Sequence, residues 1–188
     1  MKVGVLALQG DFVEHVHILR GMGHQAIEVR LPQHLDGLEA LIMPGGESTT
    51  FGKLAVRWGL IEPIRVFAQS GKPVWGTCAG LIFLAKDVGR DQPTLGLMDV
   101  RVSRNAFGRQ VDSFTTLLSI KGIDGAPFEG VFIRAPVIES IGPGVEVLCQ
   151  LPDGSVVAAQ QANLFGTSFH PELTKDARVH QLFLTRRV

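Results

Sequence analysis

The first half of the chain alternates short apolar runs with stretches whose apolar residues recur every three or four positions. Runs that are apolar throughout suit strands buried on both faces, whereas a spacing of three to four residues suits helices packed on a sheet. The alternation therefore predicts a parallel sheet covered by helices on both faces. The predicted strands cover residues 3–9, 26–31, 38–44 and 73–77.

Helical patterns fill the intervals between these strands. The first helix begins at Asp11 and Glu14, which are spaced as an N-cap and its N3 partner. Residues 48–69 are helical, with a break near Gly59 and Pro63. Each helix returns the chain to the start of the next strand, as parallel strands require.

The second half of the chain has a different pattern, in which short β-like runs are separated by Gly, Pro and Asp turns. Such closely spaced strands favour antiparallel additions to the sheet. A closing amphipathic helix is predicted from Lys175 to Arg187. The predicted fold is a three-layer α/β sandwich, flavodoxin-like, with a mostly parallel central sheet and antiparallel additions. The β-like runs cover residues 95–103, 114–120, 130–136, 145–151 and 155–161.

Length and charge narrow the class of protein. The chain has 188 residues, which suits one domain spanning 1–188, and no segment approaches the roughly 18 apolar residues of a membrane-spanning helix. Lys plus Arg equals Asp plus Glu at 18 each, which argues against nucleic acid or an anionic membrane as the main partner. Two distant cysteines and no histidine pair at metal spacing support neither a disulfide framework nor a metal site. A reduced, cytoplasmic setting is expected.

One of the two cysteines lies in a motif that carries chemistry. Residues 76–80 read GTCAG, which is G-x-S-x-G with cysteine as the nucleophile, at a predicted strand-to-helix junction. In such an elbow the thiol lies at a helix N-terminus that favours the thiolate, and the backbone N–H of Ala79 can stabilise an oxyanion. The alternative is a buried structural cysteine, which is our interpretation of Cys149.

A nucleophilic Cys78 needs a base, and His170 is the candidate. It follows a β-like run in the segment GTSFHPEL, and Glu172 stands two residues further on. In an extended backbone these two side chains point the same way, so the carboxylate can orient the imidazole; the alternative is a solvated turn. Five histidines are expected on the surface or on helix faces, without a catalytic role: His15, His17, His24, His34 and His180.

A third motif, PGGESTT at residues 44–50, follows a predicted strand. Its glycines can expose backbone N–H groups at a helix start, which suits an anion such as phosphate. Glu47 opposes phosphate, and no Lys stands at the P-loop position. One alternative is that Gly46 donates the second oxyanion hydrogen bond while Glu47 receives a cationic group; another is an ordinary capped turn.

In this order, P-G-G-E-S, G-T-C-A-G and H-P-E resemble a class I (triad) glutamine amidotransferase domain. The start MKVGVLALQG, RNAFGRQVDSF at 104–114, FIRAP at 132–136 and FHPELT at 169–174 are similar to the glutaminase subunits of pyridoxal 5′-phosphate synthase. This resemblance implies hydrolysis of L-glutamine without a cofactor or metal. It also implies transfer of ammonia to a synthase subunit in a complex with a ring-shaped synthase core.

The resemblance also implies roles for individual residues. Cys78 is the nucleophile, His170 the base and then the acid, and Glu172 orients His170, while the N–H groups of Gly46 and Ala79 form the oxyanion hole. A glutamine zwitterion needs an acceptor for its ammonium and guanidinium donors for its carboxylate, which suits Glu47 with Arg104 or Arg134. The implied glutamine contacts are Gly46, Glu47, Ser48, Arg104, Ile133 and Arg134.

Two other functions fit parts of the pattern. A cysteine hydrolase on the same elbow would act on peptides or esters, and a non-catalytic binding subunit would keep the fold without an activated thiol. Turnover of glutamine distinguishes the first alternative, and labelling of Cys78 by a glutamine-analogue electrophile distinguishes the second.

Overall fold

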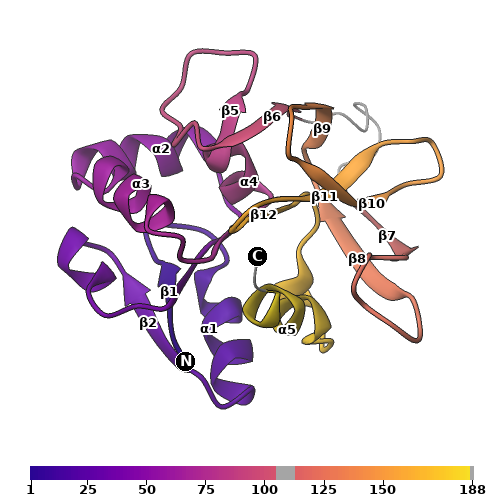
Figure 1. The fold of residues 1–188 in the computed structure, drawn as a ribbon, viewed down its shortest axis with the longest axis horizontal. Coiled ribbons are helices and arrows are strands. Elements are labelled where there is room, and N and C mark those ends of the chain that lie inside the picture. The colour runs from indigo at the N-terminus through magenta and orange to yellow at the C-terminus, as the bar shows by residue number, and fades with distance from the viewer. Residues whose placement is uncertain (105–112, 187–188) are drawn as a thin grey trace.

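A computed structural model describes residues 1–104 and 113–186 of the chain. Five parallel strands form one end of its larger sheet, in the order β2-β1-β3-β4-β12; Figure 1 labels β1, β2 and β12. The strand β12 continues the parallel set although it comes last in sequence. The parallel sheet that the sequence predicts is confirmed. Its strands are β1 (Lys2–Leu6), β2 (Gln25–Val29), β3 (Ala40–Met43), β4 (Val74–Thr77) and β12 (Leu164–Thr167).

The larger sheet continues past β12 with strands from the second half of the chain. The strands β11, β9 and β6 pair antiparallel in turn, β10 pairs with β11, and the short β5 lies parallel to β6. The sequence predicted antiparallel additions but missed β5 and β9, which are short and carry charged residues. The added strands are β5 (Ala85–Asp87), β6 (Met98–Ser103), β9 (Val137–Ile141), β10 (Glu146–Gln150) and β11 (Val156–Gln161).

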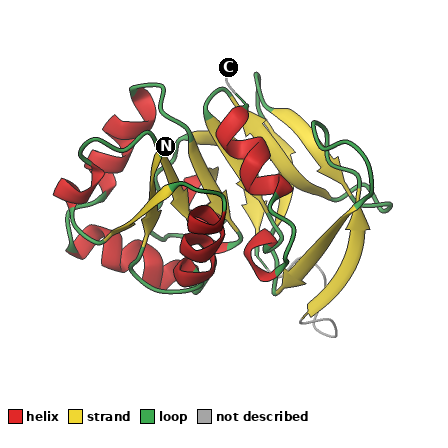
Figure 2. Ribbon diagram, turned by 90° about the horizontal axis from the view of Figure 1, so that it is seen from below, coloured by secondary structure: helices red, strands yellow, loops and turns green. Residues whose placement is uncertain are grey.

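A separate antiparallel hairpin consists of β7 (Ser113–Leu118) and β8 (Phe128–Ile133). It lies on the side of the molecule that is rich in strands, away from α2 and α3 (Figure 2). Exposed and partly buried positions alternate along β7, as expected for a strand with one covered face. The hairpin brings the end of β8 close to the segment after β12, since the backbone N–H of His170 donates to the carbonyl of Val131 at 2.8 Å.

Helices cover both faces of the parallel sheet. On one face lie α2 (Ser48–Arg57), α3 (Ile61–Gln69) and α4 (Ala79–Leu84), and on the other lie α1 (Phe12–Gly21) and α5 (Arg178–Thr185) (Figure 1). The predicted long helical stretch is broken at residues 58–60, where Gly59 has φ 65°. Pro63 lies inside the first turn of α3, where its missing N–H costs no helical hydrogen bond. No helix in the described part of the chain is long and apolar enough to cross a membrane.

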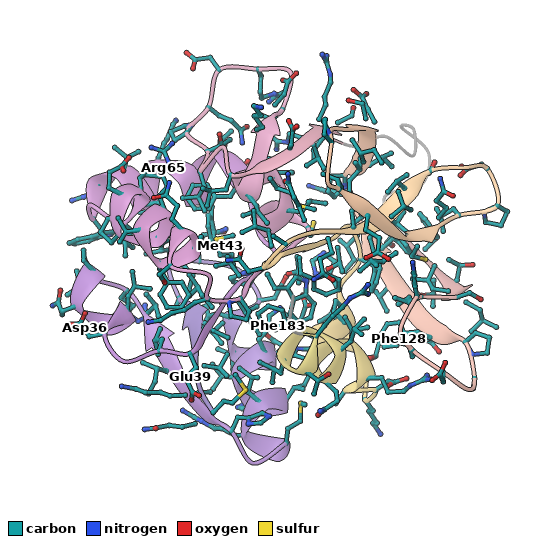
Figure 3. All side chains as sticks on the ribbon, in the orientation of Figure 1. Asp36, Glu39, Met43, Arg65, Phe128 and Phe183 are labelled. Atoms are coloured by element: carbon teal, nitrogen blue, oxygen red, sulfur yellow. The ribbon has the colours of Figure 1, made fainter. Side chains whose placement is uncertain are left out.

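Successive residues of the central strands enter two hydrophobic clusters, one on each face of the sheet. In β3, Leu41 and Met43 pack toward α2 to α4, whereas Ile42 packs toward α1 and α5. Figure 3 places Met43 and Phe183 in the interior, and Asp36 near the periphery. Burial on both faces explains why these strands read as continuous apolar runs.

Candidate active site

Cys78 occupies a sharp turn between β4 and α4. Its backbone has φ 47° and ψ −102°, a conformation that costs a non-glycine residue on the order of 1–3 kcal/mol. Two backbone hydrogen bonds hold the turn: Cys78 N–H donates to the carbonyl of Thr167 at 2.8 Å, and Ile82 N–H donates to the carbonyl of Cys78 at 3.2 Å. The strained strand-to-helix elbow that the sequence predicts is therefore present.

The two glycines of GTCAG allow the backbones around the elbow to approach closely. A Cβ added to Gly76 would lie 2.4 Å from the carbonyl carbon of Gly80, and one added to Gly80 would lie 2.0 Å from the carbonyl oxygen of Met43. Such distances are far below van der Waals contact. Both positions therefore require glycine so that α4 can pack directly on β3 and β4.

His170 and Glu172 form a buried hydrogen-bonded pair. Nδ1 of His170 lies 2.6 Å from Oε1 of Glu172, and both residues are almost fully buried. The pairing was predicted, but its geometric reason was wrong: Glu172 belongs to a 3-10 turn, η2 (Pro171–Leu173), and not to an extended segment. The turn brings the carboxylate back to Nδ1 of the imidazole ring.

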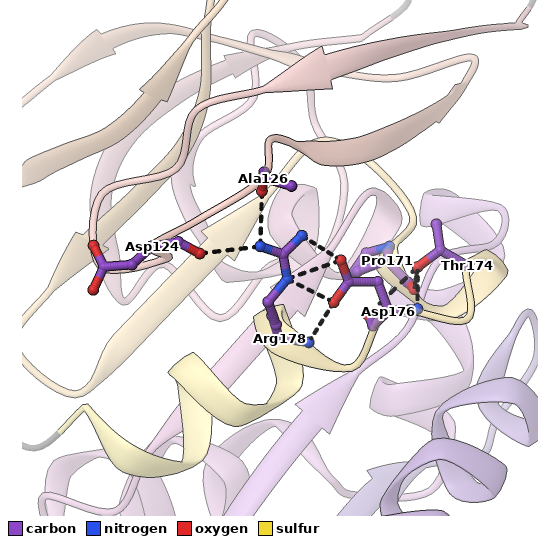
Figure 4. Close-up of polar contacts among 6 residues, drawn as sticks. All are labelled: Asp124, Ala126, Pro171, Thr174, Asp176 and Arg178. Atoms are coloured by element: carbon purple, nitrogen blue, oxygen red, sulfur yellow. Dashed lines mark hydrogen bonds and ion pairs between the residues drawn. The ribbon is translucent and has the colours of Figure 1, made fainter.

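Hydrogen bonds from Arg178 connect the segment that follows Glu172 to the loop between β7 and β8 (Figure 4). The hydroxyl of Thr174 donates to the carbonyl of Pro171 at 2.9 Å, which closes the η2 turn. Arg178, at the start of α5, donates to the carbonyls of Asp124 and Ala126 at 3.2 and 2.8 Å. Its guanidinium also contacts both carboxylate oxygens of Asp176. These contacts restrain the turn that carries Glu172.

The charge state of His170 follows from its neighbours. Burial by itself would lower the pKa of His170, but hydrogen bonds to Cys78 and Glu172 and the negative charge of both outweigh it and raise the pKa to about 10. Burial raises the pKa of Glu172 above its usual value, and the hydrogen bond from His170 opposes that shift. The site therefore favours a protonated His170 at neutral pH.

Asp11 lies beside this pair, which the sequence did not indicate. Asp11 is the N-cap of α1 and Glu14 lies in its first turn, as predicted, but the side chain of Asp11 makes no capping hydrogen bond. Instead its Oδ2 lies 3.5 Å from Nδ1 of His170. The only signal available was its place after the first parallel strand, because the carboxyl ends of parallel strands converge.

The PGGES loop runs between β3 and α2 and packs on the histidine. A Cβ on Gly45 would lie 2.5 Å from Cε1 of His170, so only glycine lets the loop contact the ring. Gly46 has φ 142°, a conformation that favours glycine. The Gln9 side chain accepts from the N–H of Glu47 at 3.2 Å and donates to its carbonyl at 3.4 Å. These contacts define the shape of the loop.

Glu47, which is expected to receive the substrate ammonium, also caps α2 and pairs with Arg104. As the N-cap of α2, its carboxylate accepts from the backbone N–H groups of Thr49 and Thr50 at 3.2 and 2.7 Å. A hydrogen bond from the Thr49 side chain, with those from these N–H groups, lowers the pKa of Glu47 to about 2. Arg104 lies 3.2 Å away through Nη2. Glu47 is thus ionised and stands next to a cation.

A cavity of about 390 Å³ opens at these residues, within the range of small-molecule pockets (roughly 300–1,000 Å³). All six residues expected to contact glutamine line it, together with Cys78 and His170, whereas Ala79 and Glu172 lie outside its lining. The cavity is also lined by Asp11, Ile82 and Leu173, which the sequence analysis did not predict as site residues. The lining is Asp11, Gly46, Glu47, Ser48, Cys78, Ile82, Arg104, Ile133, Arg134, His170 and Leu173.

Several details of the cavity wall suit a polar ligand. The hydroxyl of Ser48 is buried without a hydrogen bond among the described residues. Arg134, at the end of β8, has φ 44°, the second strained non-glycine residue in the lining. The carbonyl of Ile133 lies 3.9 Å from Sγ of Cys78. Most of the RNAFGRQVDSF motif, residues 105–112, lies outside the described residues.

The five histidines without an expected role divide into two groups. His17 is exposed and His24 and His34 are partly exposed, as predicted. His15 and His180 lie on faces of α1 and α5, which the expectation included, but these faces are fully buried, and the two rings are 2.9 Å apart through Nδ1 and Nε2. Helical spacing does not reveal which face of α1 and α5 is covered. The other cysteine, Cys149, is buried, and burial raises its pKa to about 11, which agrees with a structural role.

Among the described residues, one group of three side chains has potential metal-ligand atoms within 4.8 Å of one another: Asp11, His170 and Glu172. Two of the three are already hydrogen bonded to each other. This arrangement is the one expected for a base and its orienting carboxylate.

The chain is similar to known proteins over nearly its full length. A relative from Herpetosiphon aurantiacus, named pyridoxal 5′-phosphate synthase subunit PdxT, is 57% identical over 98% of this chain and 99% of its own length. A relative of the same name from Moorella thermoacetica is 55% identical over 98% of both chains. A solved glutamine amidotransferase structure, 51% identical, superposes with a TM-score of 0.92 over 97% of this chain and 96% of its own. PurLQS from Thermotoga maritima, 18% identical over 95% and 91% of the two chains, shares the fold with a TM-score of 0.68.

The profile of one family matches nearly the whole chain, from residue 5 to residue 188. The match includes all three motifs that form the cavity, PGGES, GTCAG and HPE. The chain belongs to the SNO glutamine amidotransferase family.

Proposed function

We propose that residues 1–188 act as one glutaminase domain, which hydrolyses L-glutamine to L-glutamate and ammonia for a pyridoxal 5′-phosphate synthase. Cys78 is the nucleophile, His170 the base and then the acid, and Glu172 the orienting carboxylate. The observation that carries this proposal is that a strained cysteine and a buried histidine line one cavity, and that Glu172 is hydrogen bonded to this histidine from behind the cavity wall. Nucleophile, base and orienter are the parts that acyl transfer needs.

The reaction begins when the Cys78 thiolate adds to the carboxamide carbon and its carbonyl oxygen becomes an oxyanion. Nε2–H of His170 gives its proton to the leaving nitrogen, the C–N bond breaks, and ammonia departs from a γ-glutamyl thioester. His170 then takes a proton from water, whose oxygen attacks the thioester and breaks the C–S bond. Glutamate leaves, and the thiolate and imidazolium are restored. The raised pKa of His170 supports this starting state.

The oxyanion hole is assigned to the backbone N–H groups of Gly46 and Ala79. Ala79 is the first residue of α4, where backbone N–H groups lack partners within the helix. Gly46 belongs to the loop that packs against His170. Two donors from different elements can meet an oxygen from two sides, and one such donor typically contributes about 10²-fold to kcat.

Recognition of glutamine is assigned to the charged wall of the cavity. The ionised carboxylate of Glu47 receives the substrate ammonium, and the guanidinium groups of Arg104 and Arg134 receive the α-carboxylate. The ion pair between Glu47 and Arg104 places opposite charges side by side, which suits a zwitterion. Ser48 and Ile133 complete the contacts, and the hydroxyl of Ser48, which has no partner among the described residues, offers a further hydrogen bond.

The partner assignment rests on the relatives, which are named as subunits of pyridoxal 5′-phosphate synthase. Ammonia released at Cys78 passes to a synthase subunit in the cytoplasm, and glutaminase subunits attach to a ring-shaped synthase core. Neither nucleic acid nor a membrane takes part, and the chemistry needs no metal or cofactor because a thiolate is the nucleophile.

The test is ammonia release from glutamine by the chain alone and with a synthase subunit. We expect Cys78→Ala to lose about 10³-fold or more in kcat, whereas Cys149→Ala, the matched control, changes stability at most. Peptides and esters are expected not to turn over. A tenth of the parent activity in Cys78→Ala would assign the nucleophile elsewhere, and turnover of esters would favour a general cysteine hydrolase.

A further inference from the structure

Two buried histidines lie behind the catalytic pair, outside the lining of the cavity. His15 comes from α1 and His180 from α5, and Nδ1 of His15 lies 2.9 Å from Nε2 of His180. On its other side, Nε2 of His15 lies 3.4 Å from Oε2 of Glu172 and 3.5 Å from the hydroxyl of Thr77. The contacts form a continuous row from α5 through α1 to the carboxylate that orients His170.

Glu172 needs a second hydrogen-bond donor. Its Oε1 accepts from His170, but its Oε2 is buried and has no hydrogen bond of good geometry among the described residues. A carboxylate removed from water is costly unless donors surround it. His15 approaches that second oxygen from the opposite side of the carboxylate.

The protonation states of the two histidines decide whether His15 can be that donor. Burial, followed by the charges of His180 and His170, lowers the pKa of His15 well below its usual value, and burial lowers the pKa of His180 to about 3. Both rings are therefore neutral at physiological pH. A neutral imidazole has one N–H and one lone pair, so the row of contacts can run in only two directions.

In the first direction, His180 donates from Nε2–H to Nδ1 of His15, and His15 presents Nε2–H to Glu172. In the second, His15 donates from Nδ1–H to His180, and a lone pair on its Nε2 faces the carboxylate. The second direction also leaves Nδ1–H of His180 as a buried donor, because that nitrogen has no partner among the described residues. Buried unpaired N–H groups are rarer than unpaired acceptors, and a lone pair repels an anion, so both terms favour the first direction.

We propose that His15, oriented by His180, is a positioning residue for Glu172, to whose second oxygen it presents Nε2–H. The proposal deepens the proposed glutaminase function, on which its kinetic consequence rests. His15 touches neither substrate nor thiol; it acts by holding the carboxylate that holds His170.

Neighbouring aromatic residues hold both rings in this orientation. Trp75 meets His15 edge to face at 5.5 Å and 82°, and meets His180 at 4.9 Å and 76°. Its own indole N–H donates to the hydroxyl of Thr167 at 3.1 Å. The side chain of Trp75 is thus fixed from β12, and it leaves the histidine rings little freedom to turn.

The titratable or charged groups around Glu172 are His170, His15 and Asp11, with Cys78 beyond His170 and His180 beyond His15. Asp11 opposes ionisation of Glu172, and His170 favours it. A donor from His15 adds to the second effect, so its loss raises the pKa of Glu172. The acidic limb of the activity profile then moves to higher pH, because protonated Glu172 no longer orients the imidazole.

The first experiment needs no activity. Two-bond ¹H–¹⁵N correlation spectra of the histidine rings at neutral pH report the tautomer of each ring, with assignments from His15→Gln and His180→Gln. We expect the Nε2–H tautomer for both His15 and His180. An Nδ1–H tautomer at His15 would overturn the proposal, whatever the chain's activity.

The second experiment uses the complex with the synthase subunit and measures kcat and KM for glutamine from pH 5 to 9. His15→Gln keeps an N–H donor near the position of Nε2, His15→Asn lacks one there, and His17→Asn changes an exposed residue of the same helix. We expect His15→Asn to lower kcat about tenfold with KM little changed, the usual effect of one hydrogen bond to a charged group. Its acidic limb is expected to move up by about half a unit to one unit.

His15→Gln is expected to keep most of the parent kcat and the parent's acidic limb. His17→Asn is expected to match the parent in both. Equal impairment of Gln and Asn at position 15, with unchanged pH limbs, would mean a purely structural role and would overturn the proposal. If the parent complex releases no ammonia, the proposed function fails instead, and the ring tautomers still decide the direction of the hydrogen bonds.

Discussion

The tightest backbone contact at the elbow gives a quantitative test of why the motif has glycine at position 80. A Cβ in Gly80→Ala would lie 2.0 Å from the carbonyl oxygen of Met43 and 2.7 Å from its carbonyl carbon. Ordinary contact begins near 3.4 Å, so α4 and β3 must separate by about 1.4 Å (3.4 − 2.0). Both colliding groups belong to the backbone, and no side-chain rotation relieves the clash.

The expected cost combines two opposing terms. Forcing a methyl group into a packed site costs typically about 1–3 kcal/mol, and a clash with rigid backbone belongs at the upper end. Replacing glycine by alanine within a helix returns about 0.5–1 kcal/mol. We therefore expect Gly80→Ala to lower the free energy of unfolding by about 2 kcal/mol. A shift of about 1 Å at the nucleophile is also expected to lower kcat about 10²-fold.

Urea unfolding and glutaminase kinetics measure the two effects. Gly21→Ala is the matched control, because a Cβ at this last residue of α1 meets no atom within 4 Å. We expect that variant to keep full activity and to be as stable as the parent, or up to about 1 kcal/mol more stable. If Gly80→Ala keeps the parent's kcat and unfolds within about 0.5 kcal/mol of it, the close approach of α4 to β3 is not what requires glycine.

The remaining predictions concern the catalytic groups. Because its pKa is raised to about 10, His170 should still be an imidazolium at pH 8.5 by NMR and should lose its proton near pH 10; titration near 6.5 would contradict the ion pair. Glu172→Gln should lower kcat less than His170→Asn, which removes a reacting group, and equal losses would mean that Glu172 does more than orient. A Cβ on Gly46 would lie 2.2 Å from Nε2 of Gln9, so Gly46→Val should bind the synthase but lose about 10²-fold of the stimulated rate; full stimulation would exclude an oxyanion role.

The sequence alone predicted those strands and motifs that are marked by a pattern of neighbouring residues. The strands of the parallel sheet read as continuous apolar runs because both their faces are covered, and GTCAG marked the elbow because only glycine permits that approach of backbones. The motifs PGGES and HPE stood at strand ends, where parallel strands direct their following loops to one edge of the sheet. The six glutamine contacts were implied by the family resemblance and not by a local pattern, and they do line one cavity.

Tertiary structure decided what the side chains contact. Glu47 caps α2 and pairs with Arg104, and the 3-10 turn, not an extended strand, brings Glu172 to His170. His15 and His180, 165 positions apart in sequence, meet because α1 and α5 pack on the same face of the sheet. Periodicity reveals that a helix has a covered face, but its partner across that face depends on how distant elements pack, and this packing sets burial, protonation and hydrogen bonding.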